Sequence, residues 1–183
     1  KNKIKNVIIS TGYKSEKIEE YLKNNINFIN YKIINDGNEL LGTGGATVNS
    51  LQYLKNNFFI IYGDSYLNFR LFDMIKKKNQ MIMALLKNKN KYDKSNVKFT
   101  NTENIRYFNN KKKIKKLLYI DYGVSYVNKT IFHGISEKTK FNLSKFYEKI
   151  SKKNMINGFI VKKRFYEVGS YKGIRDLKRY LKK

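Results

Sequence analysis

The chain has 183 residues, of which 41% are hydrophobic, and it is therefore long enough to bury a sizeable core. It contains no cysteine, which excludes disulfides, thiolate zinc sites and a cysteine nucleophile and favours a reducing, cytoplasmic compartment. The net charge of +25 comes from 39 Lys and Arg against 14 Asp and Glu, but the lysines are scattered as on a solvated surface, so we expect no specific nucleic-acid binding.

The first third of the chain predicts alternating strands and helices. The expected elements are a strand at 5–10, an amphipathic helix that includes Ser15, Ile18, Tyr21 and Leu22, a strand at 30–35, a helix at 46–56 and a strand at 58–62. The last strand consists of five consecutive large apolar residues, a run typical of a strand that is covered on both faces of a parallel sheet. This alternation predicts crossover units and a doubly wound sheet.

The rest of the chain predicts a more mixed arrangement. The expected elements are a helix at 67–78, a buried strand at 81–86, short paired strands at 96–99 and 104–108, a strand at 119–127, a helix at 141–150, strands at 158–162 and 165–168, and a closing helix. No linker and no repeat interrupts them. We therefore expect residues 1–183 to form a single α/β domain.

Asp64 is the first candidate functional residue. It follows Gly63 at the carboxyl end of the apolar strand, where ligands bind in open α/β sheets. A carboxylate at this place is suited to holding Mg²⁺ against a phosphate. The alternative is that Asp64 caps a helix that begins near Asn68.

Two further segments support a nucleotide site. Residues 41–45 form a glycine-rich segment before a helix, where backbone N–H groups and small residues let a flat or anionic ligand approach. Glu167 lies beside Gly169 at another strand tip, so a second carboxylate is available. Two acids at separate strand tips together with the glycine-rich segment predict a site for Mg²⁺ and a nucleotide.

Four segments match a known family in their order and spacing. They are LGTGGA at 41–46, YGDSYL at 62–67, YIDYGVSYV at 119–127 and FYEVGSYKGIRDL at 165–177. With these segments the chain resembles the sugar-phosphate nucleotidylyltransferases, most of all the branch with the heptose-1-phosphate and mannose-1-phosphate guanylyltransferases. The resemblance extends to VIISTGYKSEKIEEYL at 7–22, which is similar to that family's second strand and helix.

The resemblance implies a three-layer α/β/α Rossmann-like fold with a mixed, mostly parallel sheet. It implies transfer of NMP from a nucleoside triphosphate, with GTP favoured, to a mannose- or heptose-type sugar 1-phosphate, which yields pyrophosphate and an NDP-sugar for cell-surface polysaccharide. Mg²⁺ is the implied cofactor. The implied site residues are Leu41, Gly42, Thr43 and Gly44 for the nucleotide, Asp64 and Glu167 for the metal, Asp121, Tyr122 and Gly123 for the sugar, and Lys111 for the sugar phosphate.

The chain departs from the family pattern at three places, one of which is Tyr171 in the position of a usual Pro after the last Gly motif. The family's first strand and the Gly-rich loop that follows it, with an Arg and a Lys that grip the triphosphate, have no match, so we expect an N-terminally incomplete domain with little or no transferase activity. The family's acidic residue before the phosphate-binding lysine is also not evident, because the sequence reads Asn109-Asn110-Lys111-Lys112. The register of Lys111 is therefore open.

Other function classes remain as alternatives at this stage. A metal-dependent glycosyltransferase of related fold would normally show two acids bracketing one residue, whereas Tyr62 and Tyr66 flank Asp64 at that spacing. A non-catalytic nucleotide-sugar-binding relative is the second alternative. A nucleic-acid-binding module is the third. We expect no membrane partner, because no apolar run approaches the roughly 20 residues of a spanning helix, and homo-oligomers are left open.

Overall fold

The structure is a computed structural model that describes residues 4–37, 39–76, 80–109 and 117–182. The chain divides into two compact units. The first comprises residues 1–58 and 129–146, and the second comprises residues 59–128 and 147–183. Among the described residues, no helix has the length and apolar character needed to cross a membrane.

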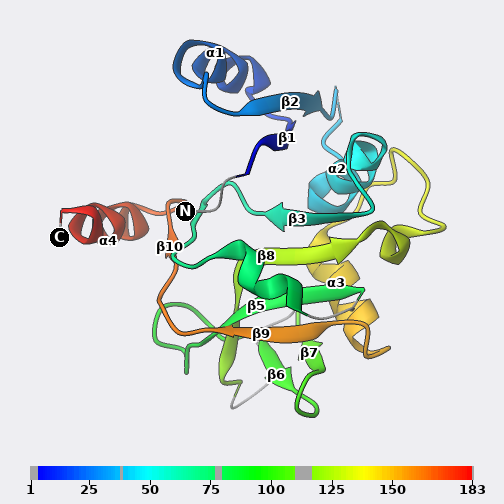
Figure 1. Ribbon diagram of the computed structural model, residues 1–183, viewed down its shortest axis with the longest axis vertical. Coiled ribbons are helices and arrows are strands. Elements are labelled where there is room, and N and C mark those ends of the chain that lie inside the picture. The colour runs from blue at the N-terminus through cyan, green and yellow to red at the C-terminus, as the bar shows by residue number, and fades with distance from the viewer. Residues whose placement is uncertain (1–3, 38, 77–79, 110–116, 183) are drawn as a thin grey trace. The chain divides into compact units, whose positions relative to one another are not determined.

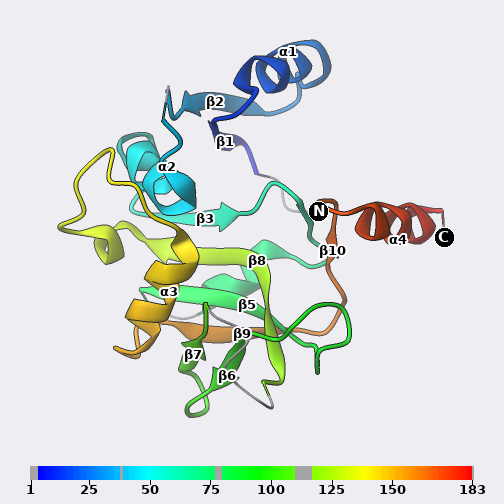
Figure 2. The same cartoon turned by 180° about the vertical axis from the view of Figure 1, so that it is seen from behind.

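The first unit contains a pair of parallel strands, β1 (Asn6–Thr11) and β2 (Asn30–Asn35). Helix α1 (Ser15–Asn25) connects them, as Figure 2 shows, and it supplies the crossover that adjacent parallel strands require. These three elements confirm the prediction for the first 35 residues. The unit also contains α2 (Gly42–Ser50) and two short 3-10 helices, η1 (Leu51–Tyr53) and η4 (Lys129–Phe132).

The second unit contains a six-stranded sheet in the order β7-β6-β8-β5-β9, with β3 paired to β8 outside that path. Figure 1 shows β8, β5 and β9 running side by side. The strands are β3 (Asn57–Ile61), of which residues 59–61 belong to this unit, β5 (Met81–Lys87), β6 (Val97–Phe99), β7 (Ile105–Tyr107), β8 (Tyr119–Asn128) and β9 (Asn157–Val161).

This sheet is mixed and mostly antiparallel, so the expectation of a mostly parallel sheet is wrong. β8 runs antiparallel to β5 and β6, and β6 runs antiparallel to β7, whereas β5 and β9 are parallel. The reason is the connection from β5 to β8, whose described residues contain the β6–β7 pair and no crossover helix. The apolar run in β5 indicates burial on both faces, and burial does not determine strand direction.

The core of the second unit lies around β5. All six residues from Met81 to Leu86 are buried. They are joined by buried side chains from neighbouring elements, among them Leu71, Met74, Val97, Ile105, Ile120 and Val124. Each large apolar side chain stabilises the fold by about 1.5–3 kcal/mol relative to its exposed state. This core supports the strands whose ends carry the candidate site.

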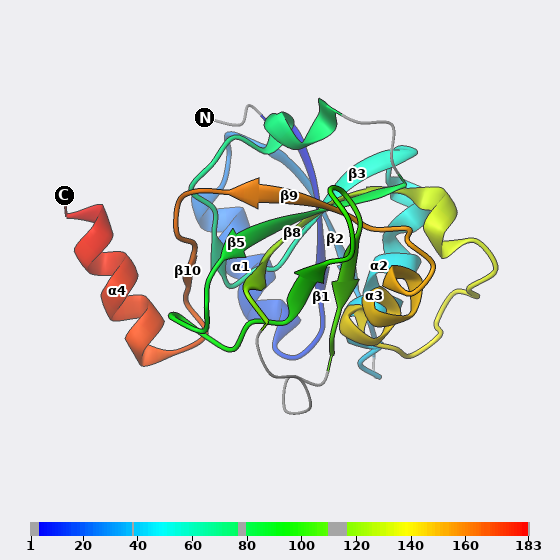
Figure 3. The same ribbon diagram turned by 90° about the horizontal axis from the view of Figure 1, so that it is seen from below.

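A second, two-stranded sheet in this unit joins β4 (Ser65–Tyr66) to β10 (Tyr166–Glu167) in antiparallel pairing. Helix α4 (Tyr171–Leu181) follows β10 directly, as Figure 3 shows. The rings of Tyr166 and Tyr180 stack with their centroids 4.8 Å apart, which attaches α4 to β10. Tyr66 and Tyr166, which are 100 positions apart in sequence, are therefore paired here beside α4.

Three predicted elements differ from the structure. The helix expected at 67–78 is a 3-10 helix, η2 (Leu71–Lys76), and the helix expected at 46–56 is α2, which begins at Gly42. Low helix propensity at the glycines predicted a loop there, but packing against the chain near Phe141 outweighs that propensity. The last strand residue, Ile61, is 41% exposed, so β3 is less covered than expected. The predicted helix at 141–150 and the predicted closing helix are confirmed as α3 (Leu143–Ser151) and α4.

Candidate functional site

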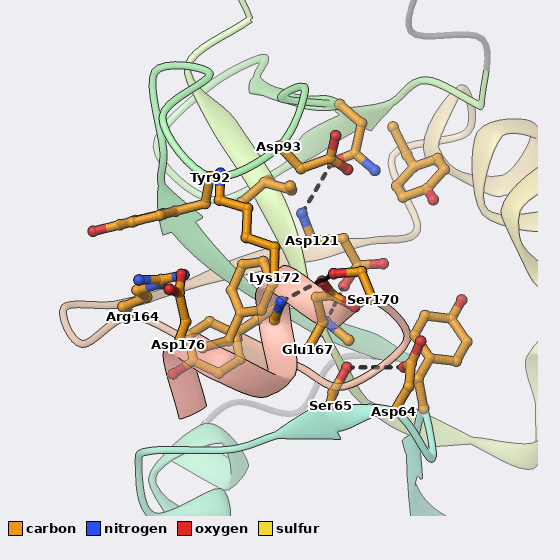
Figure 4. A pocket seen from close by; sticks show the side chains of 18 residues that line it. Asp64, Ser65, Tyr92, Asp93, Asp121, Arg164, Glu167, Ser170, Lys172 and Asp176 are labelled. Atoms are coloured by element: carbon orange, nitrogen blue, oxygen red, sulfur yellow. Dashed lines mark hydrogen bonds and ion pairs between the residues drawn. The ribbon is translucent and has the colours of Figure 1, made fainter. Parts of the chain in front are cut away.

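A cavity of about 530 Å³ lies in the second unit. Its walls come from the chain after β3, from β8 and β10, from the loop after β5 and from the first turns of α4 (Figure 4). Among the described residues, five carboxylates and two basic side chains line it. The acids are Asp64, Asp93, Asp121, Glu167 and Asp176, and the bases are Arg164 and Lys172.

Asp64 and Glu167 lie close together because β4 pairs with β10. Ser65 is opposite Glu167 in the register, and the Val168 N–H donates to the Asp64 carbonyl oxygen at 2.8 Å. A Cβ atom added to Gly169 would lie 3.2 Å from Glu167 Oε2 and 3.4 Å from Asp64 Oδ2. Both carboxylates therefore face the same small space.

The second oxygen of each carboxylate has a local hydrogen bond. Ser65 Oγ donates to Asp64 Oδ1 at 3.4 Å, and Ser170 Oγ donates to Glu167 Oε1 at 2.5 Å, as the dashed lines in Figure 4 mark. Ser170 is also the N-cap of α4, since its Oγ accepts the Gly173 N–H at 3.0 Å. These bonds orient the two acids and leave Oδ2 and Oε2 turned toward the space at Gly169.

The donor set around Gly169 fits a hard divalent cation. Carboxylate oxygens on two adjacent strands are ligands that Mg²⁺ prefers, and Mg²⁺ commonly takes one or two carboxylates with water and substrate phosphate. Within the described part of the chain, no group of three or more His, Cys, Asp or Glu side chains could hold a metal by itself. The pair therefore fits a metal that shares its coordination with a bound phosphate.

The helix-capping alternative for Asp64 does not agree with the structure. No helix begins near Asn68 among the described residues, because the next helical segment is η2, which starts at Leu71. Asp64 instead precedes β4 and lines the cavity. It lies between the end of β3 and the start of β4, and its role in the site stays a prediction.

The three residues predicted for the sugar, Asp121, Tyr122 and Gly123, all line the cavity from β8. Asp121 Oδ1 accepts the Gly123 N–H at 2.9 Å, while the Asp121 N–H donates to Asn96 Oδ1 at 3.0 Å. Gly123 has a φ of +84°, and a Cβ there would lie 2.5 Å from Ser65 Oγ. Only glycine therefore suits this position, which keeps β8 close to the Asp64 segment.

Three buried phenols, Tyr107, Tyr122 and Tyr147, and the half-buried Tyr62 lie in the same unit as Asp121. Burial raises the pKa of Tyr122 to about 12, and burial followed by the Asp121 charge raises the pKa of Tyr107 and Tyr147 still further. Burial also raises the pKa of Tyr62. These side chains are neutral at pH 7. Tyr62, Tyr107 and Tyr122 line the cavity and form an uncharged wall that can donate hydrogen bonds but cannot act as a base.

The glycine-rich segment predicted for the nucleotide lies in the first unit, at the start of α2. Gly44 and its neighbour are buried, and a Cβ on Gly44 would collide with the Phe141 ring. The Gly44 N–H donates to the Phe141 carbonyl at 2.9 Å, and Thr43 Oγ1 accepts the Leu143 N–H at 2.9 Å. Close packing therefore explains part of the glycine content, and the nucleotide role of Leu41, Gly42, Thr43 and Gly44 stays a prediction.

Lys111, predicted to contact the sugar phosphate, lies outside the described residues. Its role therefore stays a prediction.

Sequence reasoning missed a basic and aromatic group in the cavity wall. The Arg164 guanidinium lies 4.2 Å from the Tyr92 ring centroid and 4.7 Å from that of Tyr166, and it donates to Asp176 Oδ2 at 2.6 Å. The hydrogen bond from Arg164 lowers the pKa of Asp176. No sequence motif marks these residues, because they come from separate elements. The position of Arg164 three residues before Glu167 is the one signal that could have drawn attention to it.

Comparison with solved structures shows the same fold. HddC from Yersinia pseudotuberculosis matches with a TM-score of 0.80 at 19% identity, covering 98% of this chain and 80% of that one. The inositol-1-phosphate CTP transferase from T. maritima matches with a TM-score of 0.76 at 16% identity, covering 98% and 78%. The fold is therefore that of the α/β nucleotidyltransferases.

Comparison with curated protein sequences identifies the family of the chain within this fold. It is 32% identical over 177 residues to the D-glycero-alpha-D-manno-heptose 1-phosphate guanylyltransferase of Aneurinibacillus thermoaerophilus, covering 92% of this chain and 75% of that protein. It is 29% identical over 170 residues to the enzyme of that name from Campylobacter jejuni, covering 92% and 76%. No protein-family model matches. The chain belongs to the sugar-phosphate nucleotidyltransferase family.

Proposed function

We propose that the chain carries the metal and sugar side of a site at which a nucleoside monophosphate, with GMP favoured, is transferred from a nucleoside triphosphate to a sugar 1-phosphate of the heptose or mannose type. The products are an NDP-sugar and pyrophosphate. The expectation that these 183 residues have little or no transferase activity of their own stays a prediction. The relatives described as heptose 1-phosphate guanylyltransferases support the choice of base and sugar. Asp64 and Glu167 would hold Mg²⁺ in this reaction.

The observation that carries this proposal is the pair of carboxylates that face one space beside Gly169. The described residues that line their cavity carry an excess of three negative charges when all five acids and both bases are ionised. Such a lining repels a bare phosphate and attracts a divalent cation. A sugar phosphate or nucleotide would therefore enter this cavity together with a metal ion.

The chemistry requires no general base. The attacking group is a phosphate oxygen of the sugar 1-phosphate, which is already anionic at pH 7, and it forms a bond to the α-phosphorus as the bond to pyrophosphate breaks. None of the described residues that line the cavity is His or Cys, and its buried tyrosines are neutral. The protein's task is to align the two substrates and to offset their charge.

Each group of cavity residues has a part in that task. A metal held by Asp64 and Glu167 would neutralise charge on the transferring phosphate. Asp121, with its position fixed by Asn96 and Gly123, offers a carboxylate acceptor for sugar hydroxyls. Tyr62, Tyr107 and Tyr122 offer uncharged hydroxyl groups in the same region.

A binding experiment tests the proposal. GDP-mannose is titrated into the chain by calorimetry, with Mg²⁺ or with EDTA, and UDP-glucose and a DNA duplex serve as competitors. We expect binding that requires Mg²⁺ and prefers the guanine nucleotide, and we expect Asp64→Ala to weaken it by tenfold or more. Lys138→Ala, on an exposed residue of the other unit, is the matched control and should bind as the natural chain does.

Two results would contradict the proposal. Binding of GDP-mannose that is equally strong in EDTA would remove the metal from the account. Strong binding of any DNA duplex, with steep salt dependence and no effect of Asp64→Ala, would favour the nucleic-acid alternative.

A further inference from the structure

Arg164 connects three segments of the second unit: the loop after β5, β10 and α4. Its guanidinium stacks between Tyr92, from the loop after β5, and Tyr166, from β10, and it pairs with Asp176 on α4. The side chains of Arg164 and Asp176 are 29% and 22% exposed, so the pair is partly shielded from water. A planar guanidinium held between two rings is well suited to fix the direction of a carboxylate partner.

The pair with Asp176 controls the first turns of α4. Asp176 lies one turn after Gly173, and Gly173 packs directly against the backbone and carboxylate of Glu167. The N-cap Ser170 donates to Glu167 Oε1. A continuous set of contacts therefore runs from Arg164 through Asp176 and the start of α4 to the proposed metal ligand.

The same contacts determine which oxygen of Glu167 faces Asp64. While Ser170 holds Oε1, the other oxygen, Oε2, is directed toward the space beside Gly169. A displaced α4 would move Ser170 and allow the Glu167 carboxylate to turn. Figure 4 shows Arg164 beside Asp176 and Tyr92, with Glu167 between this group and Asp64.

We propose that Arg164 is a positioning residue that holds α4 so that Glu167 presents Oε2 to a divalent cation shared with Asp64. This inference rests on the proposed metal site, but it concerns residues that do not touch the metal. Residues that orient a carboxylate ligand typically change metal affinity by 10- to 100-fold when they are replaced.

Titration with Mn²⁺ in the presence of GDP-mannose, with a protein-free blank and followed by the electron paramagnetic resonance signal of the free ion, tests this inference. Arg164→Met keeps the side-chain length but removes the charge and the planar stack, and we expect about tenfold weaker Mn²⁺ binding. Asp176→Asn removes the other partner and should weaken binding in the same way. Arg164→Lys keeps a charge that can reach Asp176 and should give an intermediate affinity.

The matched control is Arg106→Met in the same unit. Arg106 is also partly buried and donates to the Ser151 carbonyl at 2.9 Å, but it does not line the cavity. We expect this variant to lose some thermal stability and to bind Mn²⁺ as the natural chain does. The comparison separates a general loss of stability from a specific loss of metal affinity. If Arg164→Met does not fold, Arg164→Lys and Asp176→Asn carry the test.

The outcomes distinguish the two proposals. If the natural chain binds no Mn²⁺, or if Asp64→Ala binds it equally well, the metal site and this inference are both overturned. If Asp64→Ala loses binding while the folded Arg164 and Asp176 variants bind like the natural chain, only the positioning role is overturned. Weaker Mn²⁺ binding in these variants, with Arg106→Met unchanged, supports it.

Discussion

Gly169 leaves the space that both carboxylates of the candidate site face. Its φ lies outside the left-handed region, so an alanine is compatible with the backbone at this position. The added methyl group would lie 3.2 Å from Glu167 Oε2 and 3.4 Å from Asp64 Oδ2. The glycine is therefore explained by the space needed beside the two acids.

We predict that Gly169→Ala weakens Mn²⁺ binding by about tenfold or more, because the methyl group displaces the two oxygens, while the melting temperature changes little. Mn²⁺ titration and differential scanning calorimetry measure the two effects. Gly63→Ala is the control, since a Cβ there meets no atom within 4 Å. Unchanged Mn²⁺ affinity in Gly169→Ala would show that the metal lies elsewhere.

At the scale of elements, α4 is fixed to β10 by close packing at Gly173. A Cβ at this position would collide with the backbone carbonyl of Glu167, which cannot move aside as a flexible side chain can. We predict that Gly173→Ala lowers the free energy of unfolding by about 1–3 kcal/mol and weakens Mn²⁺ binding together with it. Urea denaturation measures the first effect. A stability equal to that of the Gly63→Ala control would contradict the packing.

Helix α2 provides a corresponding case in the first unit. Gly44 packs against the Phe141 ring, so we predict that Gly44→Ala destabilises the fold by about 1–3 kcal/mol. The double variant Gly44→Ala with Phe141→Leu should recover part of this loss, because the smaller side chain leaves room. Urea denaturation of the four chains gives the coupling. No recovery would show that the glycine serves another purpose, such as approach of a nucleotide.

Sequence patterns predicted most strands because their information is local. Unbroken or alternating apolar runs identified β2, β5 and β8 and the paired strands β6 and β7. The direction of the sheet was not predictable in this way, because it depends on the connection between β5 and β8 and not on the composition of either strand. The 3-10 segment at Leu71–Lys76 shows the same limit, since tertiary packing decided its type.

Part of the candidate site was also predictable from sequence. Asp64 and Glu167 were found because each is a carboxylate beside a glycine at a strand end, and the structure brings them together. Arg164 was not found, because its role depends on Tyr92 and Asp176, which other elements supply. Its stacking partners have no fixed spacing in sequence that would mark them.

At the scale of the whole molecule, buried phenols make stability depend on alkaline pH. The folded-state pKa of Tyr62, Tyr107, Tyr122 and Tyr147 is raised above the ordinary value of 10.0, to about 12 for Tyr122. A raised pKa contributes stability that is fully present below pH 10 and is lost as the pH rises through the folded value. We therefore predict falling stability above pH 10.

Absorbance at 295 nm measures this effect, because it reports phenolate formation. Of the 15 tyrosines, these four should ionise only at the highest pH or on unfolding, after the exposed ones. Tyr122→Phe should remove one late phenolate. Ionisation of all tyrosines together near pH 10 in the folded protein would contradict the burial described for them.

The most direct test of the central claim is the position of a bound metal. Crystals of the chain soaked in Mn²⁺ should show an anomalous difference peak between Asp64 and Glu167, at about 2.0–2.6 Å from Asp64 Oδ2 and Glu167 Oε2. Crystals of Asp64→Ala, treated in the same way, should lack that peak. A strong peak at another site, with the space beside Gly169 empty in the natural chain, would contradict the account.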